Sequence, residues 1–173
     1  MRMSKLILLA GAVLWTTVLC ADALRLNDLE TRLASPDSKT RLAAATDLLN
    51  LGKARPLKKE EIDLVLPHLE ADPDWTIKVR VCEILPYAEN PHWVIGPLIE
   101  ALKDTQAGGE GNVPGWSCRA LGRVGDESAL KPMREWLQFL ETHPGVYGTN
   151  CDDWIRGTKK WIAELEARLK MVK

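Results

Sequence analysis

Cysteine and histidine side chains bind metals and act as nucleophiles, so they are the first residues to test for chemistry. Three of the four cysteines lie beyond residue 23, and the three histidines are scattered. A site made from His92, His143, Cys151 and Asp152 can be drawn, but these residues lack the short ligand spacings of metal sites. No Gly-x-Ser-x-Gly motif or comparable nucleophile signature occurs. The sequence therefore predicts no catalytic residue, no metal site and no cofactor.

Tryptophans beside aspartates form a second candidate site. Trp75, Trp116 and Trp154 stand near the starts of expected helices. The aspartates beside them are Asp74, Asp104, Asp152 and Asp153. Aromatic faces and carboxylates together could hold a sugar, which would suit a carbohydrate-binding or enzymatic module. Alternatively, the rings seal the ends of adjacent helical pairs, and we favour this packing role.

Two further features concern single side chains. Trp93 takes an outward position on its helix, where it either packs on a neighbouring loop or stacks on a ligand. Cys82 and Cys118 occupy equivalent positions on packed helices about 8–10 Å apart, whereas a disulfide needs Cα atoms within about 7 Å. A Cys118–Cys151 disulfide is geometrically allowed if the 141–150 loop folds back. The alternative is that these cysteines are buried free thiols.

The elements that position these residues are clearest between Asp74 and Asp104. Asp72, Pro73 and Asp74 can begin a helix that Pro86 strains or ends, and Asn90 with Pro91 can start the next as cap and first-turn proline. Two apolar stripes at helical spacing fill the two helices. The stripes consist of Ile77, Val81, Ile84, Leu85 and Ala88, then Val94, Leu98, Ala101 and Leu102.

Similar patterns predict helices through the rest of the chain, and strand signals are nearly absent. Gly52 is placed to end the second helix in a left-handed conformation. Glycine-containing loops are expected at 104–112 and 141–150. The further helices are expected at 24–34, from 38 to about 51, 60–70, 113–124, 129–140 and from 152 to about 169.

The expected helical pairs repeat. Leu48, Leu85 and Leu121 take equivalent positions, at spacings of 37 and 36 residues. In the second helix of each pair, Pro67, Pro97 and Pro132 also correspond. Such a period is typical of helical solenoids, because one pair cannot bury its own apolar face. We therefore expect an all-α fold, an α-solenoid (superhelix) of about three helical hairpins plus terminal capping helices.

Residues 37–140 resemble the HEAT family, particularly its short bilin-lyase-type repeats. The matching motifs are Asp74-Trp75-x-Ile77-Lys78, Pro97-Leu98-Ile99-x-Ala101-Leu102-Lys103-Asp104 and Ala120-Leu121-Gly122-x-Val124-Gly125-Asp126. The resemblance implies a protein-binding scaffold. It does not extend to bilin-lyase activity, because no catalytic motif is present.

The chain also departs from the family pattern. Pro86 stands where the family often has glycine. Pro114 replaces the basic residue that Arg41 and Lys78 provide in the first two repeats. The ladder of acidic and basic residues that is usual in the family is therefore expected to break at the third repeat.

The N-terminal residues 1–23 are typical of a signal peptide. Arg2 and Lys5 precede a mostly apolar run, which is shorter than the ~20 residues of a membrane-spanning helix. Cleavage after Ala23 would leave a HEAT-like domain at 24–173, in a periplasmic or secreted protein. The alternative is an envelope adaptor that is lipid-anchored through Cys20, although Leu19 is unusual before a lipidated cysteine.

The expected partner is another protein. With 23 basic and 24 acidic residues and no run of five like charges, the chain has no nucleic-acid-binding character. A membrane is expected as a partner only if Cys20 is lipidated. The outward side of the second helices should form a concave partner surface. Its candidate residues are Trp93, Glu100, Lys103, Arg134, Glu135 and Gln138.

Overall fold

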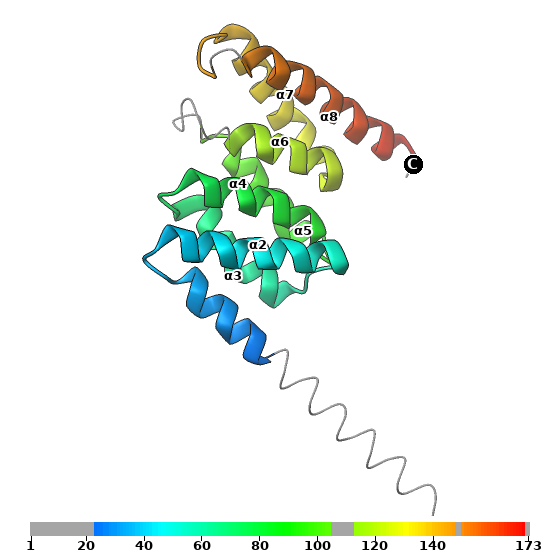
Figure 1. The fold of residues 1–173 in the computed structure, drawn as a ribbon. Helices are drawn as coiled ribbons and strands as arrows, with labels where there is room; N and C mark the ends of the chain where they lie inside the picture. The colour runs from blue at the N-terminus through cyan, green and yellow to red at the C-terminus, as the bar shows by residue number, and fades with distance from the viewer. Residues whose placement is uncertain (1–22, 105–112, 148–149, 172–173) are drawn as a thin grey trace, which may run out of the picture.

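The computed structural model describes residues 23–104, 113–147 and 150–171, and these are all-helical (Figure 1). Residues 23–33 form the first described helix. The other elements are α2 Ser38–Ala54, α3 Lys59–Ala71, α4 Trp75–Ile84, the 3₁₀-helix η1 Leu85–Tyr87, α5 His92–Ala101, α6 Val113–Val124, α7 Glu127–Thr142 and α8 Cys151–Met171. Within the described ranges, the β-type pairing is one isolated bridge, between Leu57 and Ala88. The predicted signal peptide up to residue 22, including Cys20, lies outside the described residues, as do residues 105–112 and 148–149.

The helices pack in chain order. α2 packs on α4, α4 on α6 and α6 on α8, while α3 lies against α4 and α5, and α5 against α6 and α7. The colours in Figure 1 accordingly progress from blue at one end of the molecule to red at the other. This arrangement confirms the all-α prediction.

The equivalent leucines form the centre of the core. Leu48, Leu85 and Leu121 are each fully buried, on α2, η1 and α6. Four residues before each of them stands a small or β-branched side chain, and these side chains are also completely buried. They are Ala44, Val81 and Ser117. The repeated register therefore corresponds to a repeated set of packing positions.

The predicted helix boundaries around α4 are confirmed. The Asp74 carboxylate accepts a hydrogen bond of 2.9 Å from the Thr76 backbone N–H and caps α4. Pro86 sits in the 3₁₀ turn that ends this element. The Asn90 side chain accepts from the His92 N–H at 3.1 Å, at the start of α5.

The prediction for Gly52 is wrong. α2 continues through Gly52 to Ala54, so this glycine does not end the helix. A Cβ atom at Gly52 would lie 2.9 Å from the Tyr87 Cβ and 3.3 Å from Leu57 Cδ1. Glycine therefore serves here to let Tyr87 approach the backbone of α2. The same tyrosine is held from the other side, because its carbonyl accepts a 2.8 Å hydrogen bond from the Leu57 N–H.

Ion pairs join α2 to the residue that follows α3, and α4 to the segment that follows α5. Arg41 of α2 donates two hydrogen bonds of 2.8 and 2.9 Å to Asp72, just after α3. At the equivalent place, Lys78 of α4 pairs with Asp104, after α5, at 3.1 Å. Pro114, the equivalent residue of α6, has no charge and cannot form such a pair, as the sequence predicted. Burial disfavours the Asp72 carboxylate, but hydrogen bonds from Arg41, the Asp74 N–H and His68 outweigh burial and lower its pKa.

The two ends of the described fold are covered by single helices. At the N-terminal end, Leu29 and Leu33 of the 23–33 helix are buried, and Arg25 pairs with Glu61 of α3 at 2.7 Å. At the other end, α8 packs on α6 and α7. Arg168 of α8 donates to the Gly125 carbonyl at 2.8 Å, just beyond the C-terminus of α6.

Candidate functional site: two grooves beside proline-containing helices

The helices α3, α5 and α7 each carry an internal proline: Pro67, Pro97 and Pro132. A proline inside a helix removes one backbone hydrogen bond and bends the helix locally. α3 neighbours α5, and α5 neighbours α7. The surface has one hollow at each of these two junctions. We call the α3–α5 hollow the first groove and the α5–α7 hollow the second groove.

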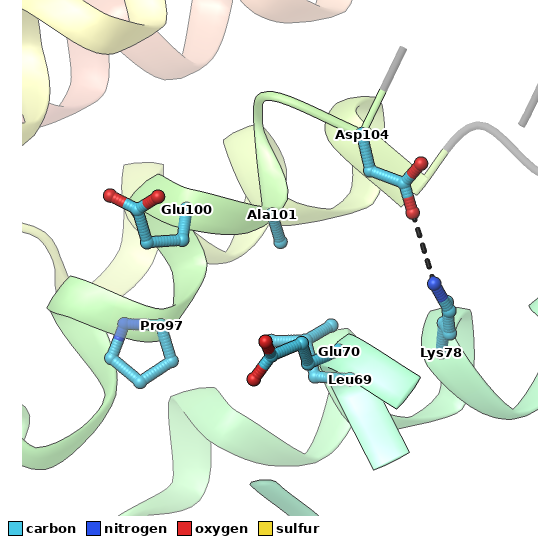
Figure 2. Close-up of a pocket in the computed structure, with 7 residues that line it drawn as sticks. All are labelled: Leu69, Glu70, Lys78, Pro97, Glu100, Ala101 and Asp104. Atoms are coloured by element: carbon cyan, nitrogen blue, oxygen red, sulfur yellow. Dashed lines mark hydrogen bonds and ion pairs between the residues drawn. The ribbon is translucent and has the colours of Figure 1, made fainter. Parts of the chain in front are cut away.

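The first groove has a volume of about 620 Å³. Leu69 and Ala101, which are 5% and 8% exposed, provide apolar surface in it. Figure 2 shows Pro97, Glu100 and Ala101 facing Leu69 and Glu70 across the opening, with the Lys78–Asp104 ion pair at one end. Its complete lining is Leu69, Glu70, Lys78, Pro97, Glu100, Ala101 and Asp104.

The second groove is smaller, with a volume of about 210 Å³. Residues of α7 form one side and residues at the end of α5 form the other. They are Ile99, Leu102 and Lys103, then Pro132, Glu135, Trp136 and Phe139.

The two grooves are lined by the same positions of successive helices. Counting from the proline, α5 contributes positions 0, 3 and 4 to the first groove, and position 7, Asp104, follows just beyond its end; α7 contributes positions 0, 3, 4 and 7 to the second groove. These four positions share one face of a helix. The fourth position after the proline is Ala101 in α5 and Trp136 in α7, so an indole fills the space that the methyl group leaves open. The groove with the smaller side chain at this position is the larger of the two.

The first groove is acidic. Glu70, Glu100 and Asp104 contribute three carboxylates, and Lys78 contributes the single ammonium group. Lys78 is already paired with Asp104. Glu100 pairs with Lys103 at 2.8 Å, but both side chains are about 70% exposed, and such surface pairs are weak. The groove therefore presents negative charge around an apolar patch.

The structure brings some of the predicted partner-surface residues to the grooves. Glu100 lines the first groove, and Lys103 and Glu135 line the second. Other predicted residues lie outside both linings. Arg134 pairs with Glu166 of α8 at 2.6 Å, and Gln138 is exposed on α7.

Trp93 is also outside the grooves. Its ring is half-buried, with the Lys59 ammonium 6.0 Å from the ring centroid. The sequence interpretation missed Leu69, Glu70, Pro97, Ala101 and Asp104 as groove residues. The spacing 0, 3, 4 and 7 from Pro97 could have found Pro97, Ala101 and Asp104, and position 3 from Pro67 is Glu70, whereas Leu69 does not follow this spacing.

The three tryptophans of the second candidate site differ in their surroundings. Trp116 of α6 packs edge-on against Trp154 of α8 at 6.2 Å between ring centroids, and Trp154 contacts Trp161 at 6.3 Å. These contacts support the packing role for Trp116 and Trp154. Trp75 stays 38% exposed at the start of α4.

The cysteines are buried thiols. Cys118 and Cys151 are not bonded to each other, so the disulfide suggested from the sequence is not present. The Cys151 thiol points to the Leu140 carbonyl at 3.7 Å, and Cys82 contacts the Ser117 hydroxyl at 3.3 Å. Burial raises the pKa of Cys82 and of Cys118 to about 12. Among the residues that the structure describes, no group of three or more His, Cys, Asp or Glu side chains could hold a metal ion.

Comparisons with known proteins show no match to a protein-family model, to a curated protein or to a solved structure. The HEAT resemblance accordingly rests on the sequence motifs. In the described part of the chain, no helix combines the length and the hydropathy needed to cross a bilayer.

Proposed function

We propose that this chain is an exported, HEAT-like α-solenoid that binds a segment of another protein without catalysis. In this proposal, residues 1–23 are a cleaved signal peptide, and residues 24–173 form about three hairpins with terminal capping helices. The observation that carries the proposal is the repeated lining of the two grooves by equivalent positions of α5 and α7. A repeated groove is the form in which solenoids present an extended binding surface.

The packing order supports the solenoid. Each first helix lies on the next, from α2 through α4 and α6 to α8, and the second helices α3, α5 and α7 follow one another in the same order. The equivalent leucines at 48, 85 and 121 are completely buried. These features are expected where each hairpin buries its apolar face against its neighbours.

The chemistry of the first groove indicates the kind of segment that it binds. Its volume of about 620 Å³ lies within the range of roughly 300–1,000 Å³ that is usual for ligand sites. Leu69 and Ala101 suit an apolar anchor side chain, while Glu70 and Glu100 suit Lys or Arg beside it. We therefore propose a basic, amphipathic segment of an envelope or extracellular protein as the ligand.

Two kinds of variant test this groove. Ala101→Trp places an indole where α7 already carries Trp136, and it should fill the first groove. Glu70→Lys with Glu100→Lys reverses the charge at two exposed positions without changing the core. Each should weaken partner binding at least tenfold, because the first removes the space and the second repels a basic segment.

The measurement is calorimetry with a partner captured from envelope extract on the purified 24–173 chain. Glu89→Lys with Glu164→Lys is the matched control, since it makes the same charge change outside both grooves. Thermal melting checks that every variant folds. A partner that binds the folded groove variants as tightly as the wild type would show that the first groove is not the binding site.

A further inference from the structure

A third hollow lies on helices α2, α4 and α6 and shares no lining residue with the two grooves. Its volume is about 260 Å³. We call it the basic hollow. Its lining consists of Leu49, Lys53, Arg80, Cys82, Glu83, Pro86, Tyr87, Trp116, Arg119, Ala120 and Arg123.

The basic hollow concentrates positive charge in a chain whose net charge is −1. Four of its side chains are cationic and one, Glu83, is anionic. Glu83 pairs with Arg80 at 2.9 Å. Within the described residues, Lys53, Arg119 and Arg123 have no carboxylate partner. The hollow therefore carries about three uncompensated positive charges.

Aromatic rings hold two of the guanidinium groups. The Arg119 guanidinium carbon lies 5.0 Å from the Trp116 ring centroid, and that of Arg123 lies 5.1 Å from the Tyr87 centroid. A cation over a ring uses the face of the ring and needs no acceptor atom. The N–H groups of both arginines therefore remain available for a ligand.

The rings are themselves fixed in place. Tyr87 packs against Gly52 of α2, and its backbone is tied to the Leu57 N–H at 2.8 Å. Trp116 packs edge-on against Trp154 of α8. Because these contacts restrict both rings, the arginines that stack on them should lose less conformational entropy when a ligand binds.

Arg80 is the fourth cation in the lining of the basic hollow. Its Nη1 group pairs with Glu83 at 2.9 Å, and its Nε atom is buried without a hydrogen-bond acceptor among the described residues. Arg80 therefore adds positive charge beside the hollow, while Arg119 and Arg123 offer the accessible N–H groups.

We propose that the basic hollow binds a phosphate group, as a compact dianionic oxyanion. A planar guanidinium group can donate two parallel N–H hydrogen bonds to two oxygens of one phosphate. About three uncompensated positive charges favour a dianion over a single carboxylate, and the volume suits one such group. This proposal concerns a different site from the protein-binding grooves and does not depend on them.

The test is titration of the 24–173 chain with inorganic phosphate at low ionic strength, followed by calorimetry and by NMR of the arginine Nε–H groups. We expect saturable binding at one site, with shifts at Arg80, Arg119 and Arg123. Arg119→Ala with Arg123→Ala should weaken binding at least tenfold. Both side chains are exposed, so the variant should fold.

Three further variants separate recognition from general charge. Arg134→Ala with Arg156→Ala removes two exposed arginines elsewhere and should change affinity less than twofold. Arg119→Lys with Arg123→Lys keeps the positive charge but removes the bidentate guanidinium groups. Its affinity for phosphate should therefore fall between those of the wild type and the alanine variant. Glu83→Gln should bind phosphate more tightly, because it removes the carboxylate that competes for Arg80. Improved binding cannot arise from damaged folding.

Phenyl phosphate and vesicles containing phosphatidic acid then identify the source of the phosphate. Binding of phenyl phosphate alone indicates a small phosphate ester, and binding of the vesicles indicates a lipid headgroup. Both results retain the site. Equal weakening in the two double-alanine variants, or phosphate binding that does not saturate, would overturn the proposal.

Discussion

The buried ion pair between Arg41 and Asp72 should contribute more to stability than the equivalent pair between Lys78 and Asp104. Asp72 is 5% exposed and Arg41 is 8% exposed. Asp72→Asn removes the charge of the carboxylate and keeps its shape. The guanidinium of Arg41 then stays buried, with the Ser35 and Pro36 carbonyls as its remaining strong acceptors at 2.9 and 3.0 Å.

These contacts allow an estimate of the stability that Asp72→Asn loses. Breaking a buried pair by removing one partner costs about 3–5 kcal/mol. The two carbonyls of residues 35 and 36 still satisfy part of the guanidinium, so we expect about 3 kcal/mol for Asp72→Asn. The equivalent pair, Lys78–Asp104, has side chains that are 17% and 31% exposed. Asp104→Asn should therefore cost less, about 1 kcal/mol or below.

Urea unfolding of both variants measures the difference, with the slope of the transition as a check that the denatured state is unchanged. The pH dependence provides a second readout. Because the pKa of Asp72 is lowered in the folded state, its contribution is fully present above the unfolded pKa of about 3.9. It is lost as the pH falls through the lower, folded pKa. The difference in free energy of unfolding between the wild type and Asp72→Asn should therefore become smaller below about pH 4.

A double variant identifies the cause. Arg41→Met with Asp72→Leu removes both charges and should recover much of the stability that Asp72→Asn loses. If Asp72→Asn costs no more than Asp104→Asn, or if its cost does not change with pH, the buried pair is not the main electrostatic link between α2 and α3.

Three other predictions address packing, thiol chemistry and export. Gly52→Ala should destabilise the fold by about 1–3 kcal/mol, because the added methyl group would meet Tyr87, and thermal melting measures this. Leu51→Ala on the same helix, where the side chain is half-buried, controls for the position; a stable Gly52→Ala protein would show that Tyr87 can move aside. The buried cysteines should resist alkylation in the native protein at pH 8. The pKa of Cys82 rises from 9.0 to about 12, which leaves about 1,000-fold less thiolate. All of them should react after denaturation, and rapid native labelling would contradict their burial. Palmitate should not label the full chain if residues 1–23 are a cleaved signal peptide, whereas labelling that disappears in Cys20→Ser would show a lipid anchor instead.

Local signals in the sequence predict the helices well. The caps at Asp74 and Asn90 and the stop at Pro86 act on the nearest few residues, so their effect can be inferred without knowing the fold. The equivalent leucines also predict which face of each first helix is buried. These predictions succeed because helix period and capping depend on neighbours in the chain.

The remaining features depend on side chains that meet across helices. Gly52 looks like a helix end in the sequence, and its role becomes clear only when Tyr87 is placed beside it. The aligned prolines pair Ala101 with Trp136, but the neighbouring helix that completes each groove cannot be read from this local spacing. The basic hollow likewise joins residues of α2, α4 and α6 that are up to 74 residues apart, from Leu49 to Arg123. Its cations are scattered in the sequence, and no charge run reveals them.

The contacts of Glu61 have a consequence for how the first helix is held. This carboxylate is 1% exposed, and it accepts from Arg55 at 2.5 Å and from the Lys58 N–H at 2.9 Å, as well as from Arg25. The 23–33 helix can therefore detach without leaving an unpaired buried charge. Its attachment rests mainly on Leu29 and Leu33, each of which contributes about 1.5–3 kcal/mol on burial, because its other ion pair to the fold, Arg32–Asp47 at 2.7 Å, is partly exposed and weak. Local unfolding should then release this helix as a unit, and its amide hydrogens should exchange with solvent before those of α2.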